Sequence, residues 1–445
     1  MKGFIYNLPE VERPTEKRLS FTTKLKWTIL ILIAYFVLGM IPLFGLDSSR
    51  LFQFQQMAML LGAEMGTLMS LGIGPIVTAS IVLQLLQGAG ILRFDLKTHE
   101  GKAQFQGLQK LLSFFFIIFE SAVYVFMGGL PASAAATNYF QMQLIIVFQL
   151  ILAGIVVLFM DEVISKWGFG SGISLFIAAG VSKSLFIRAF SWLHAQEGAK
   201  SFVGAIPELF RSLGAGDTTA AIIALCAIVA TVAVFMMAVF AQAMKVEIPL
   251  SFGKVRGQGV RWPLNFIYTS NIPVILVAAL LANVQMFVML FNKTNPTAIT
   301  SWFQGPDIVY GIITHSLLPI DFLKALVYLL IMIGGSILFS IFWVQTSGMD
   351  AKKQAEQIMA AGFQRAGFRR DPRVMEHLLE RYIGPLTVMG AITVGFLAAI
   401  ADLTGALVRG TGILLTVMII YKLYEDIAKE HMMDMNPSMK KFMGK

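Results

Sequence analysis

The chain has 445 residues, of which 56% are hydrophobic and only 14% are charged, and its mean hydropathy is +0.72. These values exclude a soluble globular domain and indicate a protein that crosses the membrane many times. The formal net charge of +9 at pH 7 is mainly a topology signal, and it leaves basic loops free to meet an acidic partner.

The N-terminal segment 1–20 carries charges along its length and lacks a cleavage site of small residues, so we expect no removable signal peptide. Ten apolar runs follow, and a helix of about 20 residues crosses a hydrocarbon core of about 30 Å. The expected spans lie at residues 27–44, 68–86, 111–129, 141–160, 171–192, 220–244, 266–291, 322–346, 383–401 and 412–424.

The segment 51–90 has the pattern of one helix broken in the middle. Its first part carries three glutamines and Glu64 among apolar residues, and an uncovered polar group costs several kcal/mol in hydrocarbon. Its second part begins near Pro75, in a first turn where the missing N–H is harmless. A half-helix that begins part-way into the membrane is typical of an element that lines a path.

The spans divide into two sets of five. We predict an all-α membrane protein with an N-terminal half at 1–192, an external connector at 193–218 and a C-terminal half at 219–445. Because each half holds an odd number of spans, the second half enters the membrane from the opposite side, as in an inverted repeat.

Most of the 35 Lys and Arg residues fall in segments that are cytoplasmic if both termini are cytoplasmic. This distribution predicts a multi-pass protein of the cell membrane in that orientation.

Two inner segments, 245–262 and 347–382, are too basic and too long to be simple connectors, and the second has the pattern of a helix–turn–helix. Orientation of the chain together with contacts to lipid headgroups is one interpretation. Docking of a large acidic body such as RNA is the other, since phosphate binding needs only Arg and Lys. Their basic residues are Lys254, Arg256 and Arg261 in the first segment, and Arg365, Arg369, Arg370, Arg373 and Arg381 in the second.

No enzyme active site is predicted. The sequence shows no Walker loop, no dinucleotide fingerprint after a strand and no paired His on one helix face, so we expect neither a cofactor nor a bound metal. The single cysteine, Cys226, lies in the sixth span and is interpreted as a packed apolar thiol.

Polar residues inside the spans are few, which makes each one informative. Glu120 is expected near the middle of the third span, where a carboxyl group should be protonated or hydrogen-bonded. Thr78 and Asn283 are its candidate partners. A purely structural cluster and a functional site both fit this pattern.

Aliphatic residues four apart also recur in two spans, as Ile73 with Val77 and Ile173 with Ile177. Residues at this spacing share a helix face, so each pair could point toward a central axis. Ordinary helix packing explains such pairs as well.

Several motifs together resemble the SecY family, the main subunit of the protein-conducting channel, and in particular its archaeal branch. The resemblance covers essentially the whole chain, with the motifs in family order. They are LGIGPIVTASIVLQLL, KWGFGSGISLFIAAG, SNIPVIL, GFRR, RYIGPLTVMGAITVGFLAAI and GTGILLTV.

The resemblance implies two inverted five-helix halves around a central pore that passes secretory polypeptides and releases transmembrane segments sideways into lipid. A plug at about 51–68 would include Leu51, Met57, Leu61 and Glu64. An aliphatic pore ring would consist of Ile73, Val77, Ile173, Ile177, Ile275 and Leu415, with the choice between Leu414 and Leu415 left open. A polar cluster at a lateral gate would consist of Thr78, Glu120 and Asn283.

The same resemblance places ribosome docking on the two basic segments, at Lys254, Arg256, Arg261, Arg365, Arg369 and Arg370. The implied partners are small subunits resembling SecE and Sec-beta, the ribosome and its RNA, signal peptides and nascent chains, membrane lipid and a second copy of the chain. The alternative function is secondary transport of a small solute, which ten spans and a broken helix also permit. A coupled transporter would need more ionisable ligands at the midplane than Glu120 provides.

Overall fold

The computed structural model describes residues 9–15, 19–46, 66–88, 91–92, 94, 98–133, 138–194, 201–252, 259–269, 272–291, 296–360, 363–364, 371–408 and 410–435. The first half contains α2 (Phe21–Leu38), the short 3₁₀ helix η2 (Leu68–Ser70), α4 (Gly74–Gly88), α5 (His99–Phe126), α6 (Tyr139–Trp167) and α7 (Gly172–Phe190). The second half contains α8 (Ala205–Ala215), α9 (Thr218–Ala243), α10 (Ile272–Phe291), α11 (Pro296–Phe303), α12 (Ile308–Ile313), α13 (Pro319–Ser347), α14 (Ala351–Ala360), α15 (Pro372–Leu403) and α16 (Gly410–Met435).

Each predicted span corresponds to a helix in the described part of the chain. Eight helical segments there are long and apolar enough to cross a membrane, and α10 adds a shorter apolar stretch at Ile272–Gln285. The tenth is α16, whose charged second part continues beyond the predicted run 412–424. Helix α5 starts at His99, before the predicted run 111–129, and Glu120 lies in the last third of this helix.

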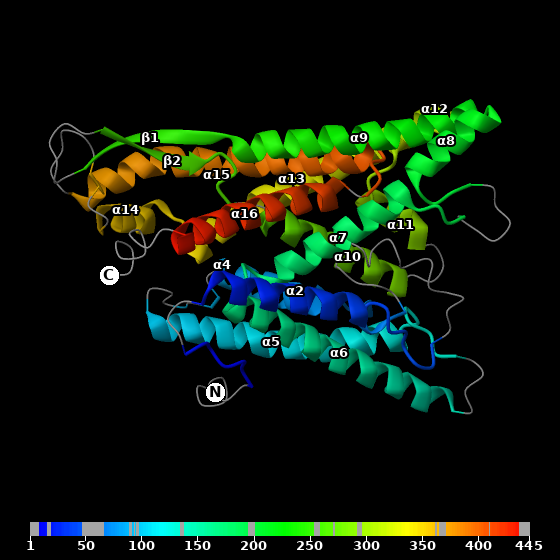
Figure 1. Cartoon of the computed structure of the whole chain (residues 1–445), viewed down its shortest axis with the longest axis horizontal. Coiled ribbons are helices and arrows are strands. Elements are labelled where there is room, and N and C mark those ends of the chain that lie inside the picture. The colour runs from blue at the N-terminus through cyan, green and yellow to red at the C-terminus, as the bar shows by residue number, and fades with distance from the viewer. Residues whose placement is uncertain are drawn as a thin grey trace.

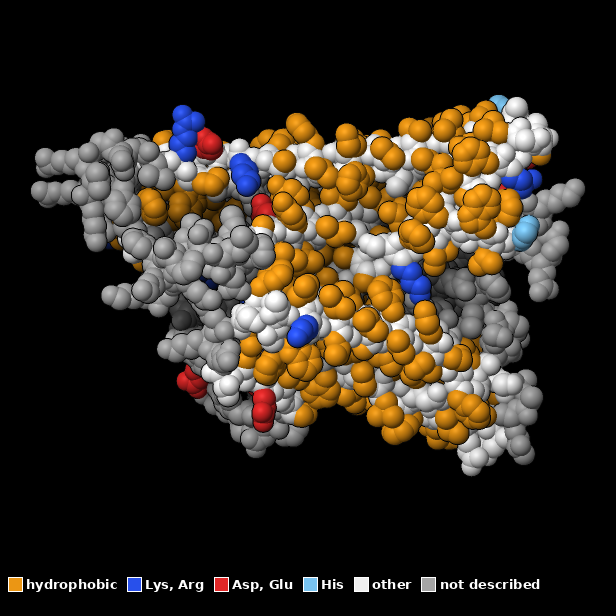
Figure 2. All heavy atoms as spheres, viewed as in Figure 1, with side chains coloured by type: hydrophobic (Ala, Val, Ile, Leu, Met, Phe, Trp, Pro, Cys, Tyr) orange, Lys and Arg blue, Asp and Glu red, His pale blue; other side chains and the backbone are white. Residues whose placement is uncertain are grey.

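The helices form two groups that enclose a shared interior. Figure 1 shows α2, α5 and α6 on one side, α9, α13 and α15 on the other, and α7, α10 and α16 between them. The largest buried apolar cluster draws residues from both halves. On the outside, large apolar side chains such as Leu30, Phe148, Val229 and Leu330 are exposed. Figure 2 shows this apolar surface over the middle of the molecule, as expected for helices in contact with lipid.

A small sheet, which the all-α prediction did not include, joins the two basic segments. Strands β1 (Lys245–Phe252) and β2 (Gly259–Asn265) form an antiparallel hairpin with Lys245 opposite Asn265, and β3 (Phe363–Gln364) pairs antiparallel with the end of β1. Ile248 and Leu250 pack from this sheet onto α14 and the first part of α15. The predicted helix–turn–helix is therefore α14, a short strand and α15.

A short N-terminal segment, residues 9–12, contacts Lys110 of α5 and the last turns of α6, and we call it the N-terminal strap. Lys110 Nζ donates to the Pro9 carbonyl and to Glu162 Oε1, at 2.5 Å each. Lys166 Nζ donates to Glu10 Oε1 at 2.5 Å, and Val11 N donates to Glu162 Oε2 at 3.0 Å. No pattern in the sequence predicts this strap, which lies at the same end of the molecule as the sheet (Figure 1).

Candidate functional site

An open cavity of about 420 Å³ lies between the two halves at the end that carries the sheet, and we call it the inner cavity. Its walls come from α4, α5, α7, α10, α13 and α16. Three predicted ring residues, Val77, Ile173 and Ile275, line it together with polar side chains. The polar lining includes Ser80, Gln84, Gln109, Ser174, Thr346, Lys422 and Asp426.

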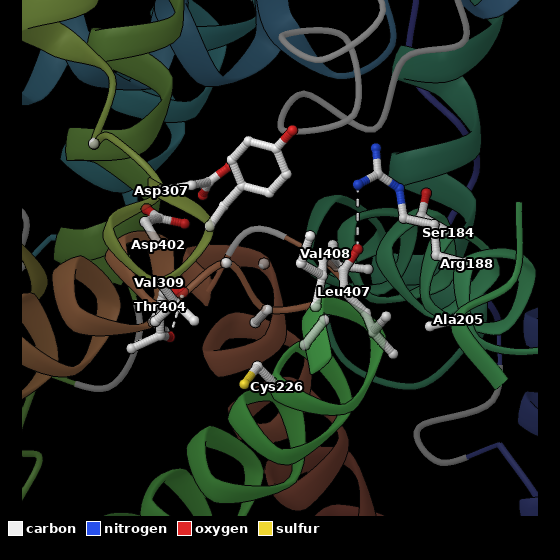
Figure 3. Close-up of a pocket in the computed structure, with 18 of the residues that line it drawn as sticks. Ser184, Arg188, Ala205, Cys226, Asp307, Val309, Asp402, Thr404, Leu407 and Val408 are labelled. Carbon is white, nitrogen blue, oxygen red and sulfur yellow. Dashed lines mark hydrogen bonds between the residues drawn. The ribbon is translucent and has the colours of Figure 1, made fainter. Parts of the chain in front are cut away.

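A second cavity, of about 710 Å³, lies at the opposite end, and we call it the outer cavity. Figure 3 shows Arg188 of α7 reaching the connection between α15 and α16, where its Nη1 donates to the Leu407 carbonyl at 3.2 Å. The Tyr328 hydroxyl donates to Asp402 Oδ2 at 2.5 Å on another wall. Cys226 is half-buried and lines this cavity, so its thiol is less enclosed than the sequence predicts.

Helices α7 and α16 line both cavities. On α7 the inner cavity is lined at Ile173–Leu175 and the outer one from Val181 onward, with Ile177 between them. On α16 the outer cavity is lined at Gly412 and the inner one from Ile419 onward. The stretch between the two cavities is apolar on α7, and on α16 it is apolar except for the buried Thr416.

The six predicted ring residues all belong to the same apolar cluster. Four of them are almost completely buried, and Ile173 and Ile275 are partly buried against the cluster. Their helices touch in pairs, α4 with α10, α10 with α16 and α16 with α7. Leu414 is as buried as Leu415, so burial does not choose between them. The four buried members are Ile73, Val77, Ile177 and Leu415.

The structure brings the three predicted gate residues together. Asn283 Nδ2 of α10 donates to Thr78 Oγ1 of α4 at 3.0 Å, and the Glu120 carboxyl group of α5 lies beside the Thr78 hydroxyl. Thr78 Oγ1 also bonds the Gly74 carbonyl at 2.9 Å within α4. Glu120 and Asn283 are buried. The cluster therefore links the first half to the second across the line where α4 meets α10 and α13.

Sequence reasoning missed a second polar contact on α4. Gln109 Nε2 of α5 donates to Ser80 Oγ at 2.7 Å, which ties α4 to α5 within the first half. Gln84, one turn further along α4, is also buried beside the inner cavity, and its Oε1 has no partner in the described structure. Gln84 interrupts an apolar helix face, which was the available sequence signal, whereas Gln109 lies in a polar stretch just before the predicted third span.

The plug residues Leu51, Met57, Leu61 and Glu64 lie outside the described residues, but both flanks of the segment are described. Leu43 N donates to the Gly66 carbonyl at 2.9 Å, and Leu68 N donates to the Ile41 carbonyl at 3.0 Å. The two flanks of the segment 47–65 are therefore hydrogen-bonded to each other next to the C-terminal end of α2.

Most of the predicted docking residues also lie outside the described part. They are Lys254, Arg256, Arg365, Arg369 and Arg370. Arg261 is described, on β2, with its side chain 80% exposed and its Nη1 2.9 Å from Glu247 Oε2.

Comparisons with known proteins agree with this geometry. The SecY family model matches residues 67–424, and the model "Plug domain of Sec61p" matches residues 33–66, which overlaps the predicted plug. A protein translocase subunit SecY of Methanothermobacter thermautotrophicus is 43% identical over 98% of this chain and 97% of its own.

Solved structures give the same result. The chain superposes with a TM-score of 0.83 on a structure described as that of a protein conducting channel, at 37% identity over 99% of both chains. It superposes with a TM-score of 0.80 on Sec61 in the canine ribosome-channel complex from the endoplasmic reticulum, at 36% identity and the same coverage.

Proposed function

The chain belongs to the SecY family of protein-conducting channels, and from this premise we propose that its two cavities and the aliphatic cluster between them form the polypeptide path. The observation that carries this proposal is the place of Ile177 and Leu415, on α7 and α16 between the two cavities. The remaining ring residues are Ile73, Val77, Ile173 and Ile275.

An aliphatic constriction suits this task. An apolar ring resists ion flow by dewetting, because water and ions gain no polar partner inside it. The same side chains deform around a passing chain of any sequence, since they make no directional bonds. Passage is not a catalytic step in this proposal, and the driving force comes from a partner.

The plug at about 51–68 would close the path from one end. Its flanks are fixed to the end of α2 through Gly66 and Leu68. A segment held at both ends can leave the pore and return without losing its place. The polar residue Glu64 fits this role, since a displaced plug meets water.

The line where α4 meets α10 and α13 would serve as the lateral gate, with Thr78, Glu120 and Asn283 as its polar contact. Opening it would expose a passing segment to lipid. Transfer is favoured by roughly 25 cal/mol for each Å² of apolar surface removed from water. The gate would thus sort segments by hydrophobicity without reading a sequence motif.

We further propose that both termini, the inner cavity and the sheet face the cytoplasm. The pairing of β1 with β3 supports a single docking unit, because it joins the two basic segments in one sheet. A ribosome would bind there through Arg256, Arg369 and Arg370. Small subunits resembling SecE and Sec-beta would bind the apolar outer surface, and a second copy of the chain could pack beside the first.

Reconstitution tests the proposal directly. The chain is placed in vesicles with its small partner subunits and offered ribosomes that carry a secretory precursor, with protein-free vesicles as the control. We expect ribosome-dependent passage that protects the precursor from added protease. Saturable uptake of a small solute without passage of the precursor would instead favour a secondary transporter.

A further inference from the structure

The first turn of α7 has no cap of its own. The first four N–H groups of a helix lack intrahelical partners, and a side chain at the N-cap position usually satisfies one of them. Thr98, Asp217 and Asp371 do this for α5, α9 and α15. At α7 the N-cap residue is Ser171, and its side chain makes no capping bond.

Asp161 of α6 supplies the missing acceptor. Its Oδ1 accepts a hydrogen bond from Ile173 N at 2.9 Å, and its carboxyl group also bonds the Gly172 backbone. A carboxylate at this place also interacts favourably with the positive end of the helix dipole. Gly172 makes the approach possible, since a Cβ there would lie 2.6 Å from Asp161 Cα.

The second half has a related arrangement, in which the bonded N–H lies two positions earlier in the matching motif. Asp402, near the end of α15, accepts from Thr411 N in the first turn of α16, with Oδ1 and N 3.4 Å apart. The sequence around each helix start also matches, as Gly-Ser-Gly-Ile at 170–173 and Gly-Thr-Gly-Ile at 410–413. In each half a carboxyl group of the fourth span thus caps the fifth span, and both fifth spans run between the two cavities.

We propose that Asp161 is a positioning residue that fixes the start of α7 and thereby holds Ile173 and Ile177 in the closed constriction. This inference rests on the proposed pore ring. Ile173 is both the residue whose N–H is capped and a residue that lines the inner cavity. Loss of the bond would let the first turn of α7 fray at the point where the seal is made.

The test compares resting ion conductance per channel, in planar bilayers at equal amounts of inserted protein. Asp161→Ala should raise the conductance by roughly five-fold, the factor expected for one lost cap. Ser171→Ala is the matched control at the same helix end, and it should leave conductance unchanged because Ser171 makes no capping bond. Asp161→Asn keeps an acceptor oxygen and should retain most of the seal.

A rescue variant separates capping from general stability. Aspartate is among the preferred N-cap residues, so Ser171→Asp combined with Asp161→Ala should restore the seal by capping α7 locally. Failure of that rescue, or an Asp161→Ala channel as tight as the parent, would overturn the inference. If Asp161→Ala is not recovered in membranes, an Asp161→Asn channel with a five-fold leak would overturn it as well.

Ile173→Gly distinguishes this inference from the proposed function. If Ile173→Gly leaks while Asp161→Ala stays tight, the pore ring stands and the positioning role fails. If Ile173→Gly itself causes no leak, the pore ring is wrong.

Discussion

Replacing Asn283 with Leu should hold the lateral gate closed. The Nδ2 atom of Asn283 makes one hydrogen bond, 3.0 Å from Thr78 Oγ1, while its buried Oδ1 has no partner in the described structure. The substitution removes a bond with a net value of about 1 kcal/mol, but it also removes an unsatisfied oxygen whose burial costs about 1–3 kcal/mol. Thr78 keeps its bond to the Gly74 carbonyl and is not orphaned.

Burial of the leucine side chain adds to this balance, so the closed gate should gain about 1–2 kcal/mol, which corresponds to a roughly five- to thirty-fold smaller open fraction. The assay uses a series of precursors whose signal sequences differ only in leucine content. The variant should need a more hydrophobic signal for half-maximal translocation. Ser80→Ala is the control, because the bond of Ser80 to Gln109 lies within the first half. An unchanged or lower threshold in Asn283→Leu channels would refute the reasoning.

Three further predictions concern other parts of the molecule. Ile275→Asn places a polar group in the constriction and should add a measurable ion leak, and a resting conductance equal to that of the parent would count against the ring. Charge reversal at Arg369 and Arg370 should weaken ribosome binding most visibly as salt rises, which co-sedimentation measures; unchanged pelleting would contradict the docking assignment. The hydrogen bond and charge of Lys166 lower the pKa of Glu10 below its ordinary 4.5, so its contribution to the strap is present above that value and is lost as pH falls through the lowered pKa. Limited proteolysis should therefore leave the N-terminus protected at pH 5 and cleave it only in more acidic buffer, while Glu10→Gln should be cleaved at both.

The sequence predicted the helices well because burial in lipid and burial in protein both demand long apolar runs. The prediction missed strand β1, whose alternating apolar residues lie in a segment that was recognised only by its basic charge. In β1, Val246, Ile248 and Leu250 alternate with other residues, which is the period of a strand. The segment was nevertheless interpreted as a basic loop, because most of its Lys and Arg residues lie among glycines in the second part of the segment.

Hydrogen bonds between segments that are distant in the sequence were also not predicted. The sequence identified Thr78, Glu120 and Asn283 as polar residues inside the spans. It could not show the contacts between them, which depend on how α4, α5 and α10 pack. The bond of Asp161 to Ile173 N and the strap contacts of Lys110 depend on the angle between consecutive helices. No periodicity within one helix encodes such an angle.

The distribution of polar contacts between the halves explains how one fold can both seal and open. Along one side the halves meet where α4 touches α10 and α13, and in the described residues the bond between Thr78 and Asn283 crosses there. Along the other side α7 packs on α16, Arg188 bonds the Leu407 carbonyl, and the chain itself continues from α7 to α8. Each half is also tied internally, by Gln109 to Ser80 in the first and by Thr269 to Ser340 in the second.

Separation of the halves along α7 is restrained by the covalent connection from α7 to α8 as well as by the bond from Arg188 to the Leu407 carbonyl, whereas the α4 side has no covalent connection between the halves. We infer that opening is a rotation of two rigid halves about the α7–α16 side. Such a motion would widen the proposed lateral gate and draw α4 and α10 apart at the proposed constriction, because Val77 and Ile275 lie on the same two helices as Thr78 and Asn283. If Val77 and Ile275 form the seal and Thr78 and Asn283 the gate, their shared helices couple the two, and a change of about 1 kcal/mol at the gate would shift both.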